Sequence, residues 1–154
     1  MSKPSAIADA KKPIPETPDE KRHPLDYVFC PRSIAVVGAS KKRGTIGAEV
    51  FANLVKRGFN GPLYPVNRAA TSIQSVRCYA SVRDIPDPVD MAVISVPSKF
   101  VPEVVDDCAA RGVKALVVLT AGYGEIDAAG KKLQDELLAK VRSHGMCMVG
   151  PNCM

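Results

Sequence analysis

The chain has 154 residues, of which 46% are hydrophobic and 24% charged, so it is long enough for one domain with a substantial core. A formal net charge of +5 predicts an anionic partner, which could by charge alone be nucleic acid, a membrane surface or a phosphorylated small molecule. The lack of Trp and the scattered Tyr and Phe argue against a single-strand nucleic-acid binder, and no apolar run reaches the roughly 18 residues of a membrane span. We therefore expect a small-molecule ligand, with neither nucleic acid nor membrane as partner.

The cysteines predict free thiols. Their number is odd, and they lack CxxC or zinc-type spacing, so neither a disulfide framework nor a metal site is expected. The N-terminus also lacks the apolar run of a signal peptide. These observations favour a reducing, cytoplasmic location. The cysteines are Cys30, Cys78, Cys108, Cys147 and Cys153.

Residues 1–24 differ in composition from the rest of the chain. They contain five prolines together with Lys, Asp and Glu, and almost no large apolar side chain. Such a segment cannot bury enough apolar surface to offset the entropy lost on ordering. We expect a flexible tail over 1–24, followed by one domain over 25–154.

From Leu25 onward, short apolar runs alternate with longer amphipathic stretches, which is typical of a βαβ architecture. The runs are unbroken by polar residues, as in strands that helices cover on both faces. Pro65 within the second run places that strand towards the sheet edge. We predict a Rossmann-like, doubly wound α/β domain. The expected strands are 34–37, 63–66, 91–96, 115–119 and 146–149, and helical spacing marks Ile46, Val50, Leu54, Val55, then Val101, Val104, Val105, Cys108, then Leu133, Leu137, Leu138, Val141.

Ligands of such sheets bind beyond the carboxyl ends of the strands, near the point where strand order reverses. The first of these loops runs from Gly38 to Gly47, between a strand and a helix, and its glycines would let backbone amides approach a phosphate. Its spacing, with Gly44 between them and a basic insert at 41–43, matches neither GxGxxG nor a Walker A loop. A phosphate-binding loop is favoured, and a glycine-rich turn with solvated lysines is the alternative.

The second loop begins with Asn67 and Arg68, where an NAD-binding fold usually has an acidic residue for the ribose hydroxyls. A basic residue suits a phosphorylated ribose instead, either the 2'-phosphate of NADP or the 3'-phosphate of CoA. The alternative is a polar turn without a ligand.

The third and fourth loops are made of small residues, with Val96, Pro97 and Ser98 in one and Thr120, Ala121 and Gly122 in the other. An extended ligand could lie across them, although ordinary turns between strands and helices have the same residues. The last strand leads into a polar turn, in which Cys153 is interpreted as a packed small residue rather than a nucleophile.

Taken together, these segments resemble the CoA-binding domain of NDP-forming acyl-CoA synthetases, a family related to the succinyl-CoA synthetase alpha chain. The same domain occurs in bacterial GNAT-type protein lysine acetyltransferases. The resemblance covers about residues 25–154. It is carried by Ser33-Ile-Ala-Val-Val-Gly-Ala-Ser40, Gly44-Thr-Ile-Gly47, Asn53-Leu54, Gly58-Phe59-x-Gly61, Tyr64-Pro-Val-Asn67, Val96-Pro97, Thr120-Ala-Gly122 and Gly150-Pro-Asn-Cys153.

The resemblance implies CoA or acetyl-CoA as ligand. The end of the first loop would hold the CoA phosphates, Arg68 or its neighbours the phosphorylated nucleotide, 96–98 the adenosine or pantetheine, and 120–122 would line the ligand's path. The expected binding residues are Gly38, Ser40, Arg43, Gly44, Thr45, Ile46, Gly47, Asn67, Arg68, Val96, Pro97, Ser98, Thr120, Ala121 and Gly122.

The family's reaction passes through a phosphohistidine in a following domain and an ATP-grasp domain, which would bind ATP or ADP. Neither fits in 154 residues, so we expect a fragment that is catalytically incomplete and works with the remaining domains or a subunit of its parent enzyme. We assign no catalytic residue, and His23 and His144 are interpreted as surface or capping residues.

Three functions stay open. The first is the CoA-binding domain of an NDP-forming acyl-CoA (acetyl-CoA) synthetase, and the second is a CoA-sensing domain of a lysine acetyltransferase. The third is an NADP-binding oxidoreductase domain, since this fold also hosts dinucleotides. The sequence does not specify the acyl substrate, the oligomeric state or the regulation.

Overall fold

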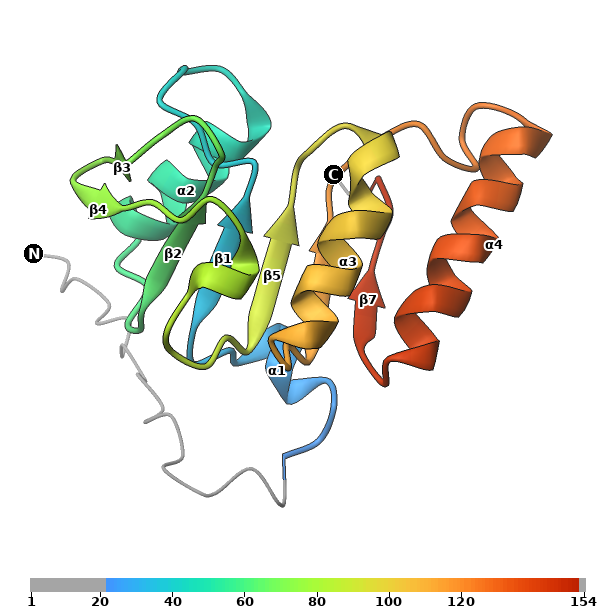
Figure 1. The fold of residues 1–154 in the computed structure, drawn as a ribbon, viewed down its shortest axis with the longest axis horizontal. Coiled ribbons are helices and arrows are strands. Elements are labelled where there is room, and N and C mark those ends of the chain that lie inside the picture. Colours follow the sequence, from blue (N-terminus) through green and yellow to red (C-terminus); the bar gives the residue numbers. More distant parts are fainter. Residues whose placement is uncertain (1–21, 153–154) are drawn as a thin grey trace, which may run out of the picture.

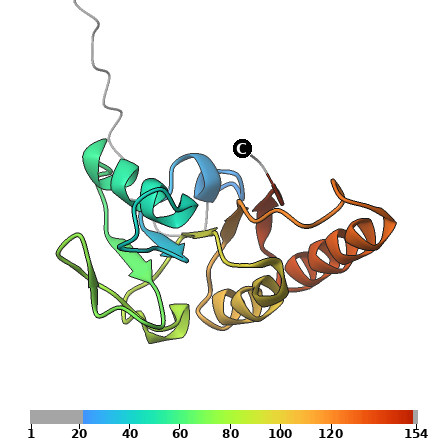
Figure 2. The ribbon, with the colours of Figure 1, turned by 90° about the horizontal axis from the view of Figure 1, so that it is seen from above.

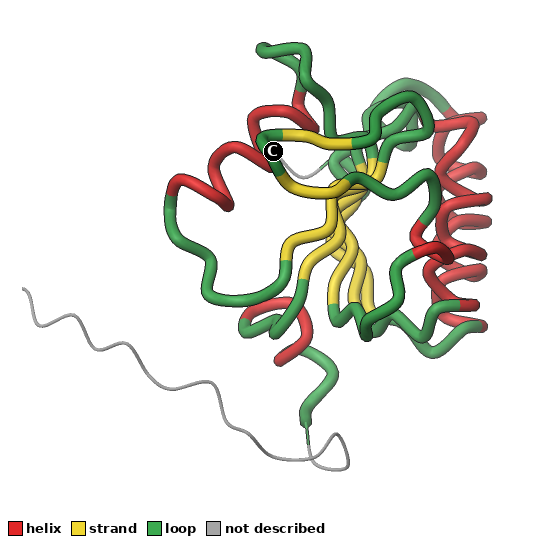
Figure 3. Tube along the Cα trace, turned by 60° about the vertical axis from the view of Figure 1, so that its left-hand side comes forward, coloured by secondary structure: helices red, strands yellow, loops and turns green. Residues whose placement is uncertain are grey.

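A parallel sheet forms the centre of the computed structural model, which describes residues 22–152 (Figure 1). Its five strands follow the order β2-β1-β5-β6-β7. The strand order therefore reverses at β1, with β2 on one side of it and the later strands β5, β6 and β7 on the other. Helices cover both faces, as Figure 3 shows. The predicted Rossmann-like, doubly wound fold is confirmed. The strands are β1 (Ile34–Val37), β2 (Leu63–Val66), β5 (Met91–Ile94), β6 (Ala115–Val118) and β7 (Cys147–Val149).

The helices divide between the two faces (Figure 2). On one face lie α1 (Asp26–Phe29) and α2 (Ile46–Lys56), and on the other lie α3 (Val101–Ala110) and α4 (Ala128–Ser143). Within the described part of the chain, no helix is both long and apolar enough to cross a membrane. The remaining elements are the antiparallel pair β3 (Ser72–Ile73) and β4 (Val76–Arg77) and the 3-10 turns η2 (Val82–Asp84) and η3 (Ser98–Phe100).

Two hydrophobic cores lie on opposite faces of the sheet, because successive side chains of a strand point in opposite directions. In β1, Ala35 and Val37 join the core under α3 and α4, whereas Ile34 and Val36 join the core that contains Phe51 of α2. All four β1 residues are buried. This double burial explains the unbroken apolar runs in the sequence.

The bounds of β1 and β2 match the prediction, and β2 lies at the sheet edge as Pro65 indicated. The buried face predicted for α2 is partly wrong, because Ile46 and Val55 are each 43% exposed. The buried residues of this helix include Gly47, Ala48 and Phe51. Small residues bring the helix backbone close to the sheet, and they carry little hydrophobic signal in the sequence. The prediction for α4 is also wrong at Leu133, which is 51% exposed.

Arg22 fastens the segment before α1 to the domain. Its Nη1 lies 2.6 Å from Oδ2 of Asp90, just before β5, and its guanidinium lies 4.3 Å from the ring centroid of Tyr27. Nη2 donates to the backbone oxygens of Asp26 and Cys30. Of the tail predicted over 1–24, residues 1–21 lie outside the described residues. Arg22, its next residue, is packed against the domain.

The buried cysteines are expected to be unreactive. Burial raises the pKa of the Cys108 thiol to about 12, whereas Cys30 is exposed. Because the thiolate is the reactive species, we expect iodoacetamide at pH 8 to label Cys30 about a hundredfold faster than Cys108, or more. Peptide mapping by mass spectrometry checks this, with urea-unfolded protein as the control in which both are labelled. Comparable native rates would contradict the burial of Cys108. Cys153 lies outside the described residues.

Candidate functional site

A cavity of about 320 Å³ lies where the sheet reverses, beyond the carboxyl ends of β1, β2 and β5. We call it the switch-point pocket. The apolar part of its lining includes Val37, Val66, Val82, Val96 and Val104. Its polar part is formed by Asn67, Arg68, Ser81, Glu103 and Asp107. An apolar cavity with a few polar groups suits a flat ring system that carries polar substituents.

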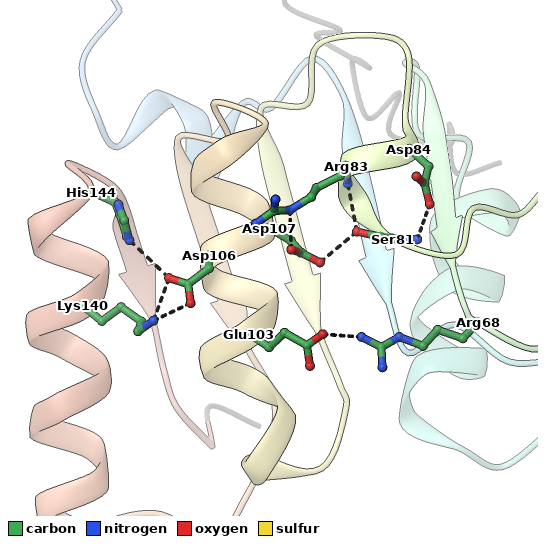
Figure 4. A network of polar contacts seen from close by, with 9 residues as sticks. All are labelled: Arg68, Ser81, Arg83, Asp84, Glu103, Asp106, Asp107, Lys140 and His144. Atoms are coloured by element: carbon green, nitrogen blue, oxygen red, sulfur yellow. Dashed lines mark hydrogen bonds and ion pairs between the residues drawn. The ribbon is translucent and has the colours of Figure 1, made fainter.

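Polar contacts join α3 to the loop after β2 and to the segment around η2 (Figure 4). Nη2 of Arg68 lies 2.6 Å from Oε1 of Glu103, and these side chains are 69% and 55% exposed. Asp107 accepts hydrogen bonds from Oγ of Ser81 at 2.8 Å and from Nε of Arg83 at 2.6 Å. The mouth of the pocket therefore contains two carboxylates that each already have a cationic partner.

The third acid of α3, Asp106, points towards α4 (Figure 4). Its carboxylate lies 2.6 Å from Nζ of Lys140 and 3.4 Å from Nε2 of His144. The hydrogen bond from Lys140 lowers the pKa of Asp106. This contact joins the two helices on one face of the sheet.

Glycines in the first loop are required by close packing. Gly38 lines the pocket with φ of +92°, and a Cβ there would lie 2.8 Å from Oγ of Ser95. A Cβ on Gly47 would lie 2.0 Å from the carbonyl oxygen of Gly38. The first turn of α2 therefore lies directly on the end of β1. The amide of Gly44 donates to Oε1 of Glu49 at 2.9 Å.

The other predicted residues of this loop lie outside the switch-point pocket. Ser40 and Arg43 line a separate groove of about 580 Å³ beside α2, together with Lys41. Thr45 is the N-cap residue of α2, but its side chain accepts no hydrogen bond from the first-turn amides. Its hydroxyl instead donates to the carbonyl oxygen of Lys42. The first-turn amides of α2 are thus not capped by Thr45, and Ile46 at the start of the helix is exposed.

Asn67 and Thr120 connect neighbouring loops. Nδ2 of Asn67 donates to the carbonyl oxygen of Ala39 at 2.7 Å, and its Oδ1 accepts from the amide of Ala69. The hydroxyl of Thr120, which is buried, donates to the carbonyl oxygen of Val96 at 2.7 Å. These contacts hold the loop backbones in place around the pocket.

The fourth loop lies apart from the pocket. The amides of Gly122 and Tyr123 donate to the carboxylate of Glu125, which lowers the pKa of Glu125. Ala121 is exposed, and it lines neither the switch-point pocket nor the groove beside α2. Ser98, from the third loop, lines a third hollow, of about 380 Å³, between α3 and α4. Of the predicted site residues, the pocket brings together Gly38, Asn67, Arg68, Val96 and Pro97.

Sequence reasoning missed the contribution of α3. The pocket is lined by Glu103, Val104 and Asp107 of α3 and by Phe100, the last residue of η3, and their spacing places them along one helical face. Two acids flanking an apolar residue on that face were the available signal. Within residues 22–152, no group of three or more His, Cys, Asp and Glu residues is placed so that it could hold a metal ion.

The model of a family described as a CoA binding domain matches residues 32–154 of the chain. The chain belongs to this CoA-binding domain family. The family description favours CoA over the NADP alternative.

The chain is similar to parts of longer CoA ligases. It is 44% identical over 132 residues to the alpha subunit of acetate–CoA ligase [ADP-forming] I of Pyrococcus furiosus, covering 83% of this chain and 29% of that protein. It is 35% identical to 4-hydroxybutyrate–CoA ligase [ADP-forming] of Nitrosopumilus maritimus, covering 82% and 18%. The apo dinucleotide-forming acetyl-coenzyme A synthetase 1 of Ca. Korarchaeum cryptofilum superposes with a TM-score of 0.80 at 46% identity, covering 83% and 28%.

This CoA-binding domain therefore spans less than a third of the length of these relatives. Their names favour a CoA ligase over the acetyltransferase alternative.

Proposed function

We propose that this domain binds CoA in the switch-point pocket as the CoA-binding part of an ADP-forming acyl-CoA synthetase. The observation that carries the proposal is a pocket with an apolar lining and with Arg68 at its mouth, next to a glycine-rich loop that leads into α2. The adenine ring would lie among Val37, Val66 and Val104. Arg68 would then bind the 3'-phosphate, since a guanidinium matches phosphate geometry.

The pyrophosphate would lie at the Arg43–Gly47 end of the first loop. One observation supports this assignment: the α2 helix begins there without a cap from Thr45. The dipole of a helix also favours negative charge at its N-terminus. The pantetheine arm would then pass over 96–98 towards 120–122. In this arrangement the chain holds and orients CoA, or acetyl-CoA, while the bond-making steps take place in the remaining domains or subunit of the whole enzyme.

We also propose that the acid is selected outside this domain. Relatives over the same region are named for different acids, acetate in one case and 4-hydroxybutyrate in another. A domain that binds the nucleotide end of CoA meets the same group in each case.

The proposal is tested by calorimetric titration of the chain with CoA, acetyl-CoA, dephospho-CoA, NADP and NAD. We expect CoA and acetyl-CoA to bind, dephospho-CoA to bind more weakly, and the nicotinamide dinucleotides to bind weakly or not at all. Strong binding of NADP without binding of CoA would overturn the assignment.

Arg68→Ala is expected to weaken CoA binding by about 1–3 kcal/mol, the value of a charge-assisted contact, with a much smaller effect on dephospho-CoA. The physical reason is that dephospho-CoA lacks the phosphate that Arg68 would bind. Arg142→Ala serves as the control, because it removes an equal charge from an exposed position on α4 that does not line the pocket. Equal losses for both ligands in Arg68→Ala would remove Arg68 from the phosphate site.

A further inference from the structure

The Arg68–Glu103 ion pair lies across the mouth of the pocket in which the proposed function places CoA. We propose that Glu103 determines specificity, because its carboxylate competes with the 3'-phosphate of CoA for the guanidinium of Arg68. Glu103 thereby sets how strongly the pocket prefers CoA to dephospho-CoA. This inference rests on the proposed function.

The geometry leaves Arg68 able to change partner. Arg68 comes from the loop after β2 and Glu103 from the first turn of α3, and their side chains meet (Figure 4). Both residues line the same pocket. Their contact is a single one, from Nη2 to Oε1 at 2.6 Å. A guanidinium has five N–H donors, so further donors of Arg68 can meet a second anion.

Because both side chains are exposed, Arg68 can exchange Glu103 for another anion. With side chains 69% and 55% exposed, Arg68 and Glu103 form a surface ion pair, a class that contributes little net stability. A phosphate can bind a guanidinium through two parallel hydrogen bonds and carries more charge than a carboxylate, so it binds Arg68 more strongly. After the exchange the carboxylate of Glu103 still lies beside the phosphate and repels it.

The two other acids of α3 have partners that are not proposed to bind the phosphate. Asp107 is held by Ser81 and Arg83, and Asp106 faces Lys140 on α4. Glu103 is thus the α3 carboxylate whose cationic partner is also the proposed phosphate ligand. Its charge acts on the phosphate directly, and removing it leaves the contacts of the other two acids intact.

Glu103→Gln tests the inference, because the substitution keeps the size of the side chain and removes its charge. Two unit charges about 4 Å apart in water interact by somewhat more than thermal energy, so we expect CoA to bind about fivefold more tightly. Binding of dephospho-CoA should change less than about twofold. Asp135→Asn is the matched control, since Asp135 forms an ion pair of similar exposure with Lys131 on α4. It should leave both affinities unchanged.

A double-mutant cycle completes the test. In the Arg68→Ala background, Glu103→Gln should change the ratio of CoA to dephospho-CoA affinity less than it does in the unaltered chain, because the competition for the shared cation is gone and only the direct repulsion remains. Equal effects on both ligands, or weaker binding of CoA to Glu103→Gln, would overturn the competition. Failure of the unaltered chain to bind CoA would instead overturn the proposed function, and the titrations of the unaltered chain show this before any variant is made.

Discussion

Gly47→Ala is expected to destabilise the domain by about 3 kcal/mol or more and to abolish CoA binding, because overpacking against backbone cannot be relieved by a side-chain rotation. The new Cβ would lie 2.0 Å from the carbonyl oxygen of Gly38 and 2.6 Å from its carbonyl carbon. Gly38 is itself held, since its amide donates to the carbonyl oxygen of Val66 at 3.0 Å. Helix α2 must therefore move away from β1, and the loop that lines the pocket moves with it.

Urea unfolding and CoA titration of Gly47→Ala measure both effects. For the unfolding measurement, Gly44→Ala is the matched control in the same loop: Gly44 has φ of +79°, and a Cβ there would meet nothing within 4 Å. That variant should cost only about 1 kcal/mol, the strain of a left-handed conformation. If both variants unfolded at the same urea concentration, α2 would not be packed on the end of β1.

Arg22→Ala is expected to lower the free energy of unfolding by about 3 kcal/mol, since breaking one side of a buried ion pair leaves the other charge without its partner. The side chains of Arg22 and Asp90 are only 6% and 15% exposed. Asp90 would keep the hydrogen bond from the amide of Arg32 but lose the guanidinium. The measurement is unfolding in guanidinium chloride.

Arg22→Lys should recover only part of this stability, because an ammonium group keeps the charge but not the planar set of donors that reaches Asp26 and Cys30. Arg142→Ala, at an exposed position of α4, should change stability by less than about 0.5 kcal/mol. Equal stability of Arg22→Ala and Arg142→Ala would show that the segment before α1 adds nothing to the domain.

Much of the fold could be predicted because burial on both faces of a parallel sheet leaves a direct record in the sequence. The run Ile34–Val37 is apolar throughout because its side chains enter two cores. Pro65 indicated an edge position because it cannot donate in the sheet. The buried face of α2 was harder to predict, because Gly47 and Ala48 pack closely without being strongly hydrophobic.

The site was only partly predictable for a different reason. The predicted strand ends indicate which loops lie at the same edge of the sheet. As expected from this, Gly38 and Arg68 line one pocket. The contribution of Glu103 depends on how α3 crosses the sheet, which spacing alone does not give. The partners of Asn67 are likewise a property of the folded chain: both ends of its amide contact loop backbone. A polar residue after a strand can hold a loop as readily as a ligand.

The hydrogen bonds from Asn67 to Ala39 and from Thr120 to Val96 bear on how fast the domain would bind a nucleotide. Loops that are already fastened lose little freedom when a ligand arrives, so capture of the nucleotide would not wait for a slow closing step. If its nucleotide end is held by loops that do not move, the pantetheine part of CoA can reach only a small volume. In the proposed acyl-CoA synthetase, the thiol at its tip would then meet an acyl donor at a high effective concentration.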